Sequence, residues 1–357
     1  MTRPDPPAGP SVPRRHVLAA LGLGAGALAA SPLLAACGGG TSPATTSAGG
    51  GGAAPVKAQL GWLKLTQFGG FFAAQEKGYY AEEKLAPTFT PGGPNILAWQ
   101  SVASRGSLTG DDDNTNVLVA IAKGQPLVIY GAIFQTSPFA VISKADKPVT
   151  SIQDFAGRTI AIPEAARQQV TGLLKGAGID PGKVKLIPAG PDPTQLVTGQ
   201  ADGYWGYATA QGVALEAQGL DINVLYLEQL GIPSYGNVLI AKKDDVEKNQ
   251  DQLVRYLRAS AKGFEYMNKN PDEIGRLVAT KYGPSGLKPE TEIATAKFQK
   301  DLIESPKGVL AVDPDKMQKI VDGLVKVGTL PSAPKVSDIV TTAVHEKAFG
   351  GKTSLLG

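Results

Sequence analysis

Residues 56–90 read VKAQLGWLKLTQFGGFFAAQEKGYYAEEKLAPTFT. The stretch predicts a strand over 57–62 and then a helix over 68–77, which Gly78 ends. A second strand is expected over 85–90, before a Pro-Gly-Gly-Pro turn. A strand, a helix and another strand in this order are typical of a parallel sheet with helices on both of its faces.

The same alternation continues to residue 134, and a second round of it begins at residue 140. In the first round we further expect helices over 95–104 and 115–123 and strands over 107–110 and 126–134. In the second round the expected helices begin at 152, 167 and 194, and the expected strands are 140–143, 158–162, 184–187, 203–205, 224–226 and 237–241. From Asp244 onward, apolar residues spaced three and four apart predict a mostly helical chain.

These two rounds predict an α/β protein of two lobes. About 320 residues follow the export signal described below, which is too many for one core of ordinary size. We assign residues 56–140 and 242–357 to lobe one and residues 141–241 to lobe two, with the helical C-terminal region packed on lobe one. Strands 140–143 and 238–241 are the predicted hinge. Because ligands sit outside the carboxyl ends of parallel strands, the expected site is a cleft between the lobes.

The first 36 residues have the features of an export signal. Arg14 and Arg15 precede an apolar run over 17–30, and small residues lead up to Cys37, the single cysteine of the chain. The apolar run is too short to cross a bilayer, and a Ser-Pro pair at 31–32 breaks it. The paired arginines suit twin-arginine export, and the general export route is the alternative.

Cys37 is the predicted site of lipid attachment. A lipoprotein signal peptidase would leave this cysteine as the mature N-terminus, where more than one acyl chain would give stable anchoring. After the cysteine, residues 38–55 are only Gly, Ser, Thr, Ala and Pro, so we expect 37–55 to be a flexible tether. The predicted location is the outer face of the cytoplasmic membrane.

Composition argues against several classes of function. The formal net charge of +3 is small and the cations are spread along the chain, which gives no basic surface for nucleic acid. After Cys37 the sequence has one histidine, His345, and no cysteine, so a catalytic triad and a histidine-based metal site are not expected. The sequence has no phosphate-binding loop and no dinucleotide fingerprint. The acids at 111–113 lie on one expected loop, whereas paired-carboxylate hydrolysis needs carboxylates that face each other. We therefore expect no catalytic residue, metal or cofactor.

Several segments of the sequence together resemble one known family. They are GW at 61–62 with QFGGFFAAQEKGYY at 67–80, KGQP at 123–126, IFQTSP at 133–138, SIQDFAGRTI at 151–160 and GQADGYW at 199–205. These segments are similar to ones in periplasmic substrate-binding proteins of ABC importers. The subgroup they resemble is related to the thiamine-pyrimidine synthases and binds thiamine pyrimidines, flavins, sulfonates or nitrate.

The resemblance implies a two-lobed periplasmic-binding-protein fold of the type II-like kind, with two crossover strands at the hinge. It also implies a small-molecule ligand and an ABC permease with its ATPase as partners. The protein would be a monomer that meets the membrane through its lipid. Hinge closure around the ligand would present both lobes to the permease. The related synthase relies on a histidine and a cysteine-rich segment, which this sequence lacks.

Aromatic residues near the expected strand ends are candidates for stacking on a flat ligand. The candidates in lobe one are Trp62 and, at the start of the next helix, Gln67 and Phe68. The candidates in lobe two are Tyr204, Trp205 and Tyr207, with Thr209 and Gln211 to read the polar edge of a ring, and Tyr235 on the second crossover. The alternative role for Trp62 is to cover the core.

Polar candidates lie on the loops that face the predicted cleft. Asp111, Asp112 and Asn114 are expected after the third strand, where the alternative role of such residues is to cap the next helix. Further candidates, each with a turn or a cap as its alternative role, are Gln135, Ser137 and Glu164. The acidic loop argues against an anionic ligand, because an anion needs free N–H groups, hydroxyls or arginine.

The sequence therefore predicts an exported lipoprotein that captures a small nutrient and delivers it to an ABC importer. The expected ligand is a flat heterocycle, such as a thiamine pyrimidine precursor or a flavin. One alternative is a protein of the same fold that binds an aliphatic sulfonate, taurine or nitrate. The other alternative is a lipid-anchored ligand sensor without a role in transport.

Overall fold

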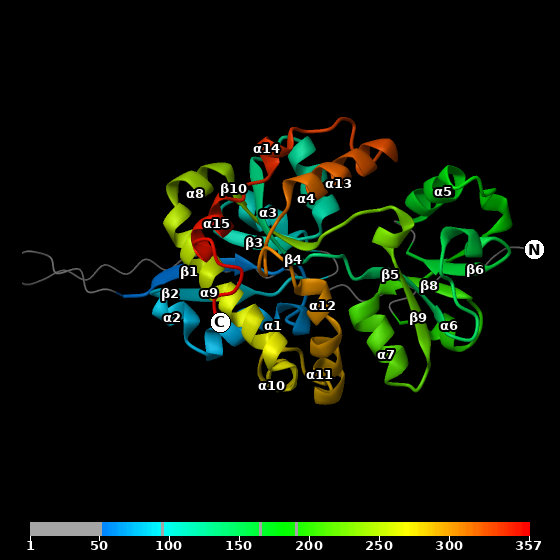
Figure 1. Ribbon diagram of the computed structural model, residues 1–357, viewed down its shortest axis with the longest axis horizontal. Coiled ribbons are helices and arrows are strands. Elements are labelled where there is room, and N and C mark those ends of the chain that lie inside the picture. The colour runs from blue at the N-terminus through cyan, green and yellow to red at the C-terminus, as the bar shows by residue number, and fades with distance from the viewer. Residues whose placement is uncertain (1–51, 94–95, 164–165, 190–191) are drawn as a thin grey trace, which may run out of the picture. The chain divides into compact units, whose positions relative to one another are not determined.

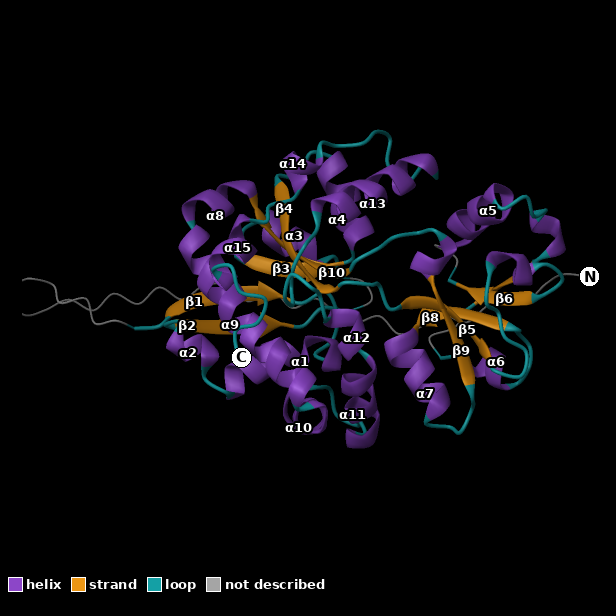
Figure 2. Ribbon diagram, viewed as in Figure 1, coloured by secondary structure: helices purple, strands orange, loops and turns teal. Residues whose placement is uncertain are grey.

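The computed structural model describes residues 52–93, 96–163, 166–189 and 192–357. The predicted export signal, Cys37 and most of the predicted tether lie outside the described residues. Two five-stranded sheets organise the described part of the chain, and helices cover both faces of each sheet (Figure 1, Figure 2). No helix within the described ranges is both long and apolar enough to span a bilayer.

The first sheet has the strand order β2-β1-β3-β10-β4. Its strands are β1 (Ala54–Gln59), β2 (Leu85–Thr90), β3 (Thr109–Asp112), β4 (Leu127–Phe134) and β10 (Gly236–Lys242). β1 pairs in parallel with β2 and β3, whereas β10 runs antiparallel to both β3 and β4. All of β4 is buried, because alternate side chains meet the helices on opposite faces of the sheet.

The second sheet has the strand order β7-β6-β8-β5-β9. Its strands are β5 (Phe139–Lys144), β6 (Thr159–Ile162), β7 (Lys185–Pro188), β8 (Gly203–Tyr207) and β9 (Ile222–Tyr226). β6 pairs in parallel with β7 and β8, and β5 runs antiparallel to β8 and β9. β5 and β10 thus play equivalent parts, since each is an interior antiparallel strand that the chain enters from the other sheet.

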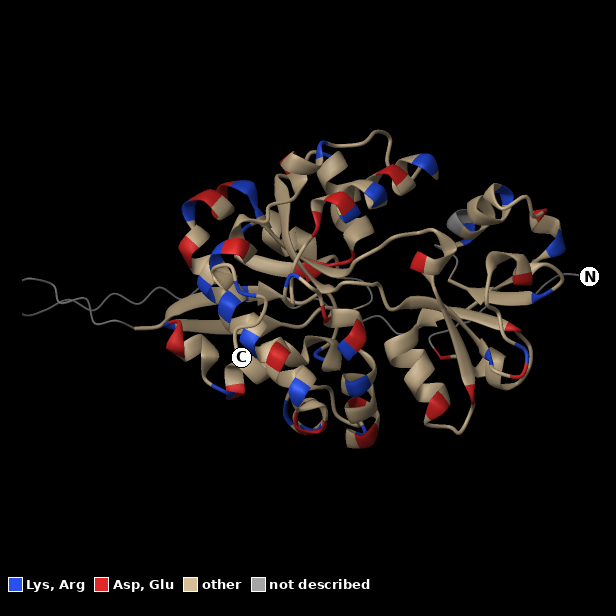
Figure 3. Ribbon diagram, in the orientation of Figure 1, with Lys and Arg blue, Asp and Glu red and all other residues tan. Residues whose placement is uncertain are grey.

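The helices carry most of the charge, and the strands carry little (Figure 3). Those up to β10 are α1 (Gly69–Glu76), α2 (Tyr79–Glu82), α3 (Ala98–Ala103), α4 (Asn114–Ala122), α5 (Arg167–Gly176), α6 (Thr194–Val197) and α7 (Val213–Glu216). Those after it are α8 (Lys243–Lys248), α9 (Gln250–Lys269), α10 (Pro271–Leu277), α11 (Pro289–Phe298), α12 (Lys300–Ile303), α13 (Pro314–Lys326), α14 (Val336–Ile339) and α15 (Ala343–Phe349). The C-terminal helical region packs on the first sheet, as predicted, through α9, α13 and α15.

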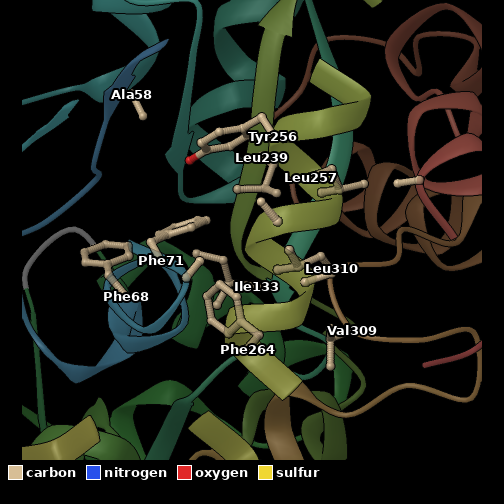
Figure 4. Close-up of a cluster of buried hydrophobic side chains, with 14 of the residues drawn as sticks. Ala58, Phe68, Phe71, Ile133, Leu239, Tyr256, Leu257, Phe264, Val309 and Leu310 are labelled. Atoms are coloured by element: carbon tan, nitrogen blue, oxygen red, sulfur yellow. The ribbon is translucent and has the colours of Figure 1, made fainter. Parts of the chain in front are cut away.

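The first sheet has a separate apolar core on each face. Side chains of α1, α9 and α15 form the core on one face, and side chains of α4, α13 and α14 form the core on the other. Figure 4 shows part of the first core, where Phe71 and Phe264 meet edge to face with ring centres 5.1 Å apart. Phe71 and Phe72 are fully buried there, so both pack the core.

Two glycines let α1 and α9 approach each other very closely. A Cβ atom on Gly263 of α9 would lie 2.0 Å from the carbonyl oxygen of Gly70, and a Cβ on Gly70 would lie 2.2 Å from the ring of Phe264. Contacts this short leave no room for even a methyl group. The packing of the longest helix on the first sheet therefore requires glycine at both positions.

Two adjacent aromatic residues of β8 lie on opposite faces of the second sheet. Trp205 faces the core under α5, together with Val141 and Leu174. Tyr204 faces the opposite core, together with Leu196 of α6 and Leu215 of α7. Adjacent residues of a strand point to opposite faces, so these two rings cannot act on one ligand from the same side.

The sheets differ from the sequence prediction in two respects. Both are mixed rather than parallel, because the chain passes from β4 into β5 and returns from β9 into β10. The crossing segments are 135–138 and 227–235, just before the strands predicted as the hinge, and β10 lies in the first sheet although its residues fall within the range assigned to lobe two. The third strand also starts two residues later than predicted, so that Asp111 and Asp112 belong to β3 and not to a loop.

We expect the Gly263→Ala substitution to lower the free energy of unfolding by at least about 2 kcal/mol, because overpacked cores lose about 1–3 kcal/mol and here the clash is with backbone. Urea denaturation of both proteins measures the difference. The matched control is Gly323→Ala in α13, where an added Cβ meets no atom within 4 Å. That control should gain up to about 1 kcal/mol from higher helix propensity. Equal effects of the two substitutions would contradict the packing argument.

Candidate functional site

The loops after eight strands meet between the two sheets. β1, β2, β3 and β4 run in the same direction, so they all end where the chain leaves the first sheet. In the second sheet β6, β7, β8 and β9 likewise end at the edge where β5 begins. Figure 2 shows the two sets of strand ends on either side of the crossing segments. Ligand sites of α/β proteins lie at such carboxyl ends.

A cleft of about 680 Å³ lies between these two edges. The first lobe lines it with the start of α4 and one face of α13, and the second lobe lines it with α5 and the second crossing segment. Its volume is in the range of small-molecule sites. Among the predicted site residues, Asn114 and Trp205 line the cleft. Phe139, which was not predicted, also lines it and touches Tyr207.

The start of α4 already has partners for its backbone N–H groups. The Asp113 carboxylate accepts from Thr115 N at 2.8 Å, and Asp112 accepts from Asp113 N at 2.8 Å and from Trp99 N at 3.1 Å. Asn114 Oδ1 accepts a hydrogen bond of 2.8 Å from Ser234 Oγ on the second crossing segment. This helix start is therefore capped by carboxylates and tied to the crossing segment, which leaves little for an anion to bind.

Asp111 is buried beneath the loop that carries Trp62. Its side chain accepts from Gly61 N at 3.1 Å and from Asn237 Nδ2 at 2.6 Å. Burial, opposed by these two hydrogen bonds and assisted by the charge of Asp112, raises the pKa of Asp111 to about 7. Asn237 Oδ1 has no partner, although the side chain is buried. Asp111 thus positions the loop and does not face the cleft.

The Trp62 loop is held on both sides and exposes its indole. A Cβ on Gly61 would lie 2.9 Å from Asp111, and a Cβ on Gly92 would lie 2.4 Å from the carbonyl oxygen of Leu60. Gly92 N donates to the carbonyl of Trp62 at 2.8 Å. The Trp62 side chain is 38% exposed, which is unusual for tryptophan in a well-packed lobe. Trp62 does not cover the core, which leaves its indole free to stack.

The other aromatic candidates separate into buried and half-buried side chains. Phe68 and Tyr204 lie in the cores, 0% and 2% exposed, and do not line the cleft, so they are not carried into the proposed site. Trp205 is 3% exposed and is kept because it does line the cleft. Tyr207 is half-buried and meets the ring of Phe139 edge to face, with centres 4.4 Å apart. Burial, with the negative charges of Asp113 and Asp111, raises the pKa of the Tyr207 hydroxyl. Tyr207 of the second lobe therefore lies close to acids of the first.

The remaining polar candidates mostly make contacts within the protein. Gln135 donates to the carbonyls of Ala132 and Ala311, and Ser137 accepts from Phe139 N and is 3% exposed. The Tyr235 hydroxyl accepts from Asp313 N at 2.8 Å. These residues order the crossing segments. Because their polar groups are already hydrogen-bonded within the protein, we do not propose them as ligand contacts.

Four further candidates remain. Gln211 Oε1 accepts from Tyr207 N at 2.8 Å, and the buried Thr209 accepts through its carbonyl from Thr295 Oγ1 of α11 at 3.2 Å. Gln67 is half-buried at the first turn after the Trp62 loop. Glu164 lies outside the described residues. Gln211 and Thr209 thus order the segment after β8, and Gln67 stays a candidate contact.

Sequence patterns did not reveal two parts of this site. The first is a contact across the hinge, in which Glu228 accepts from Thr136 Oγ1 at 2.9 Å and from Lys316 Nζ at 2.8 Å. The second is the apolar wall formed by α5 and α13, which face each other across the cleft although about 150 residues separate them. Amphipathic spacing in α13 was the available signal, but it does not say which element the apolar face meets.

Comparisons with known proteins place these features in a wider group. Residues 65–274 match the family model described as NMT1/THI5 like. The chain is 26% identical over 255 residues to a riboflavin-binding protein of Chloroflexus aurantiacus, covering 70% of this chain and 71% of the relative. It is 27% identical over 261 residues to a formylaminopyrimidine-binding protein of Halalkalibacterium halodurans, covering 71% and 79%.

A solved structure shares the fold at lower identity. The periplasmic aliphatic sulphonate binding protein of Escherichia coli superposes with a TM-score of 0.61 at 14% identity, covering 85% of this chain and 94% of that one. The predicted two-lobed architecture of periplasmic binding proteins is therefore confirmed.

We expect Asp111→Asn to change how stability depends on pH. The folded-state pKa of about 7 lies above the unfolded value of roughly 3.9, so the folded protein holds this proton more tightly and loses stability as the pH rises from about 4 to about 7. The variant has no such proton, and Asn237 can turn its unpartnered Oδ1 toward the new amide. The stability of the variant relative to the wild type should therefore rise between pH 4 and pH 8 by on the order of 4 kcal/mol.

Denaturation at a series of pH values measures this difference. Other acids and His345 titrate in both proteins, so their contributions cancel when the variant is compared with the wild type. A difference that stays constant from pH 4 to pH 8 would show that Asp111 titrates normally.

Proposed function

We propose that this chain, which belongs to the NMT1/THI5-like family, is the solute-binding protein of an ABC importer and takes a flat heterocycle as its ligand. The observation that carries the proposal is the exposed Trp62 on a rigid loop at the carboxyl end of β1, which is one of the strand ends that face the second sheet. An indole held in this way offers a stacking face at little entropic cost. The names of the riboflavin-binding and formylaminopyrimidine-binding relatives support the same ligand class.

The polar side of the proposed site suits a neutral or cationic ring. Asp113 and Asn114 face the cleft from the start of α4, and the charge of Asp113 acts on Tyr207 of the second lobe. Carboxylate and amide groups of this kind accept from ring N–H and amino groups. We therefore propose Trp62, Asp113, Asn114, Trp205 and Tyr207 as the ligand contacts, with Gln67 at the edge.

A sulfonate or nitrate is the second candidate, because the fold is shared with a sulfonate-binding protein. An anion would need free donors at the start of α4, and Asp113 accepts from Thr115 N there at 2.8 Å. Arg105 precedes β3, so it lies at the other end of that strand from α4, and its guanidinium is paired with Asp244 and Asp245. These contacts favour the heterocycle over the anion.

Ligand capture in this proposal uses closure about the two crossing segments. Glu228 lies on the second crossing segment and binds both Thr136 of the first segment and Lys316 of α13. A ligand that touches both lobes binds the closed form more tightly than the open form. Binding therefore shifts the protein toward the closed form, by the difference between the two binding free energies. Delivery to a permease with its ATPase then follows, and we propose that the protein acts as a monomer without catalysing a reaction.

The absence of an evident catalytic group supports binding over catalysis. His345 is the one histidine among the described residues, and it stacks on Phe349 with ring centres 4.2 Å apart, within the first lobe. Burial lowers the pKa of His345, so the ring is neutral at physiological pH. No group of three or more His, Cys, Asp or Glu in the described part of the chain is arranged to hold a metal ion.

We expect Trp62→Ala to weaken heterocycle binding by roughly 5- to 100-fold, because stacking of a ring on an aromatic side chain is worth about 1–3 kcal/mol. Titration calorimetry with riboflavin and with formylaminopyrimidine measures the dissociation constants. Leu63→Ala is the matched control, since Leu63 is the next residue and is also 38% exposed. Binding of an alkanesulfonate alone, unaffected by Trp62→Ala, would overturn the proposed ligand class.

We also propose export and lipid attachment at Cys37. The Cys37→Ser variant should move the protein from the membrane fraction to the soluble fraction, because the thiol that would carry the diacylglycerol is missing. Incorporation of labelled palmitate and partition into a detergent phase measure the change. Ser42→Ala serves as the control and should remain in the membrane fraction. Equal labelling of wild type and Cys37→Ser would contradict the lipoprotein proposal.

A further inference from the structure

We propose that the cleft has a second, apolar compartment between α5 and α13, and that it takes the hydrocarbon part of an amphipathic ring ligand. The proposal rests on the proposed function and narrows its ligand class. The compartment is lined by apolar side chains of α5, α13 and the second crossing segment, which are Leu173, Ala177, Ile320, Leu324, Val327, Leu230 and Ile232. It is continuous with the polar end of the cleft at Asp113–Asn116.

The apolar walls of this compartment are only partly covered by the rest of the protein. Leu173, Leu230, Ile232 and Val327 are half-buried. Ile320 and Leu324 extend the core beneath α13 to the surface of the cleft. Among the described residues that line the cleft, Asp113 and Lys326 alone are charged. A continuous apolar wall with a few polar groups at one end is the usual form of a site for a ring with one polar edge.

The volume of the cleft also exceeds the need of a single ring. At the ~30 Å³ that each water molecule takes in the liquid, about 680 Å³ holds on the order of 20 non-hydrogen atoms. One substituted pyrimidine fills roughly half of that volume by the same measure. The remaining space lies against the α5 and α13 walls, so the geometry favours a fused ring system whose apolar edge enters the compartment.

Three glycines keep this space open. Gly172 and Gly176 of α5 and Gly323 of α13 line the cleft, and a Cβ added to any of them would meet no atom within 4 Å. In a helix, alanine is more stable than glycine at such an open position. Because glycine has no side chain, the two walls are lower at these three positions. The space that this leaves between the walls suits a flat ring.

The test fills the compartment and compares two ligands that share one polar edge. Lumichrome has three fused rings with a dimethylbenzene edge, and lumazine has the same pyrimidinedione edge without the benzene ring. We expect wild type to bind lumichrome at least tenfold more tightly than lumazine. Gly176→Leu should weaken lumichrome binding at least tenfold and leave lumazine binding unchanged, because the new side chain occupies only the apolar space.

Two further variants separate this effect from a change in folding. Lys175→Leu adds the same side chain to the same helix at an exposed position that does not line the cleft, and it should bind both ligands as the wild type does. Gly323→Leu fills the compartment from the opposite wall and should repeat the effect of Gly176→Leu. Replacing glycine with leucine raises helix propensity, so both glycine variants should remain folded, which thermal denaturation checks.

The outcomes distinguish this proposal from the proposed function. If the wild type binds lumichrome and Gly176→Leu binds it equally well, the compartment is not used and the proposed function still stands. Equal affinity of the wild type for lumazine and lumichrome would overturn the compartment in the same way. If the wild type binds neither of these ligands and neither riboflavin nor formylaminopyrimidine, the proposed function fails and the compartment fails with it.

Discussion

The buried carboxyl group of Asp111 joins three segments that are far apart along the chain. Asp111 lies in β3, accepts a hydrogen bond from the N–H of Gly61 in the loop after β1, and accepts another from the side-chain amide of Asn237 at the start of β10. These partners lie 50 and 126 residues away. The position of the Trp62 loop and the entry of the returning chain into the first sheet both depend on this one group. A carboxyl group is seldom buried without such partners, because its burial is costly.

Local patterns in the sequence were sufficient to predict the strands. They did not predict the buried acids of β3 or the antiparallel direction of two strands. Each of the ten strands falls within a few residues of its predicted range, since apolar runs between turns mark buried strands clearly. Asp111 and Asp112 were predicted on a loop because acids rarely occupy a buried strand, and only long-range partners make them stable there. The antiparallel direction of β5 and β10 depends on how the chain crosses between sheets, which periodicity does not specify.

The candidate site could likewise be predicted only in part. Features set by neighbouring residues could be predicted, and contacts between distant segments could not. The exposure of Trp62 on a loop at a strand end could be anticipated from its position in the sequence. The alternation of a strand also places Tyr204 and Trp205 on opposite faces, so their separation could have been derived from β8 alone. That Leu173 and Leu324 line the same cleft could not be predicted, because α5 and α13 belong to different lobes and no motif connects them.

The α13 wall has a consequence for how members of this family diverge. The family match ends at residue 274, whereas α13 begins at Pro314. The shared signature therefore covers β2 to β10 and α5, but neither Trp62 nor the helix that forms the opposite apolar wall. Selection can alter the size of the accepted molecule by exchanging residues of α13 while the signature stays intact. Two descendants of one ancestor can thus carry the same signature and collect different nutrients.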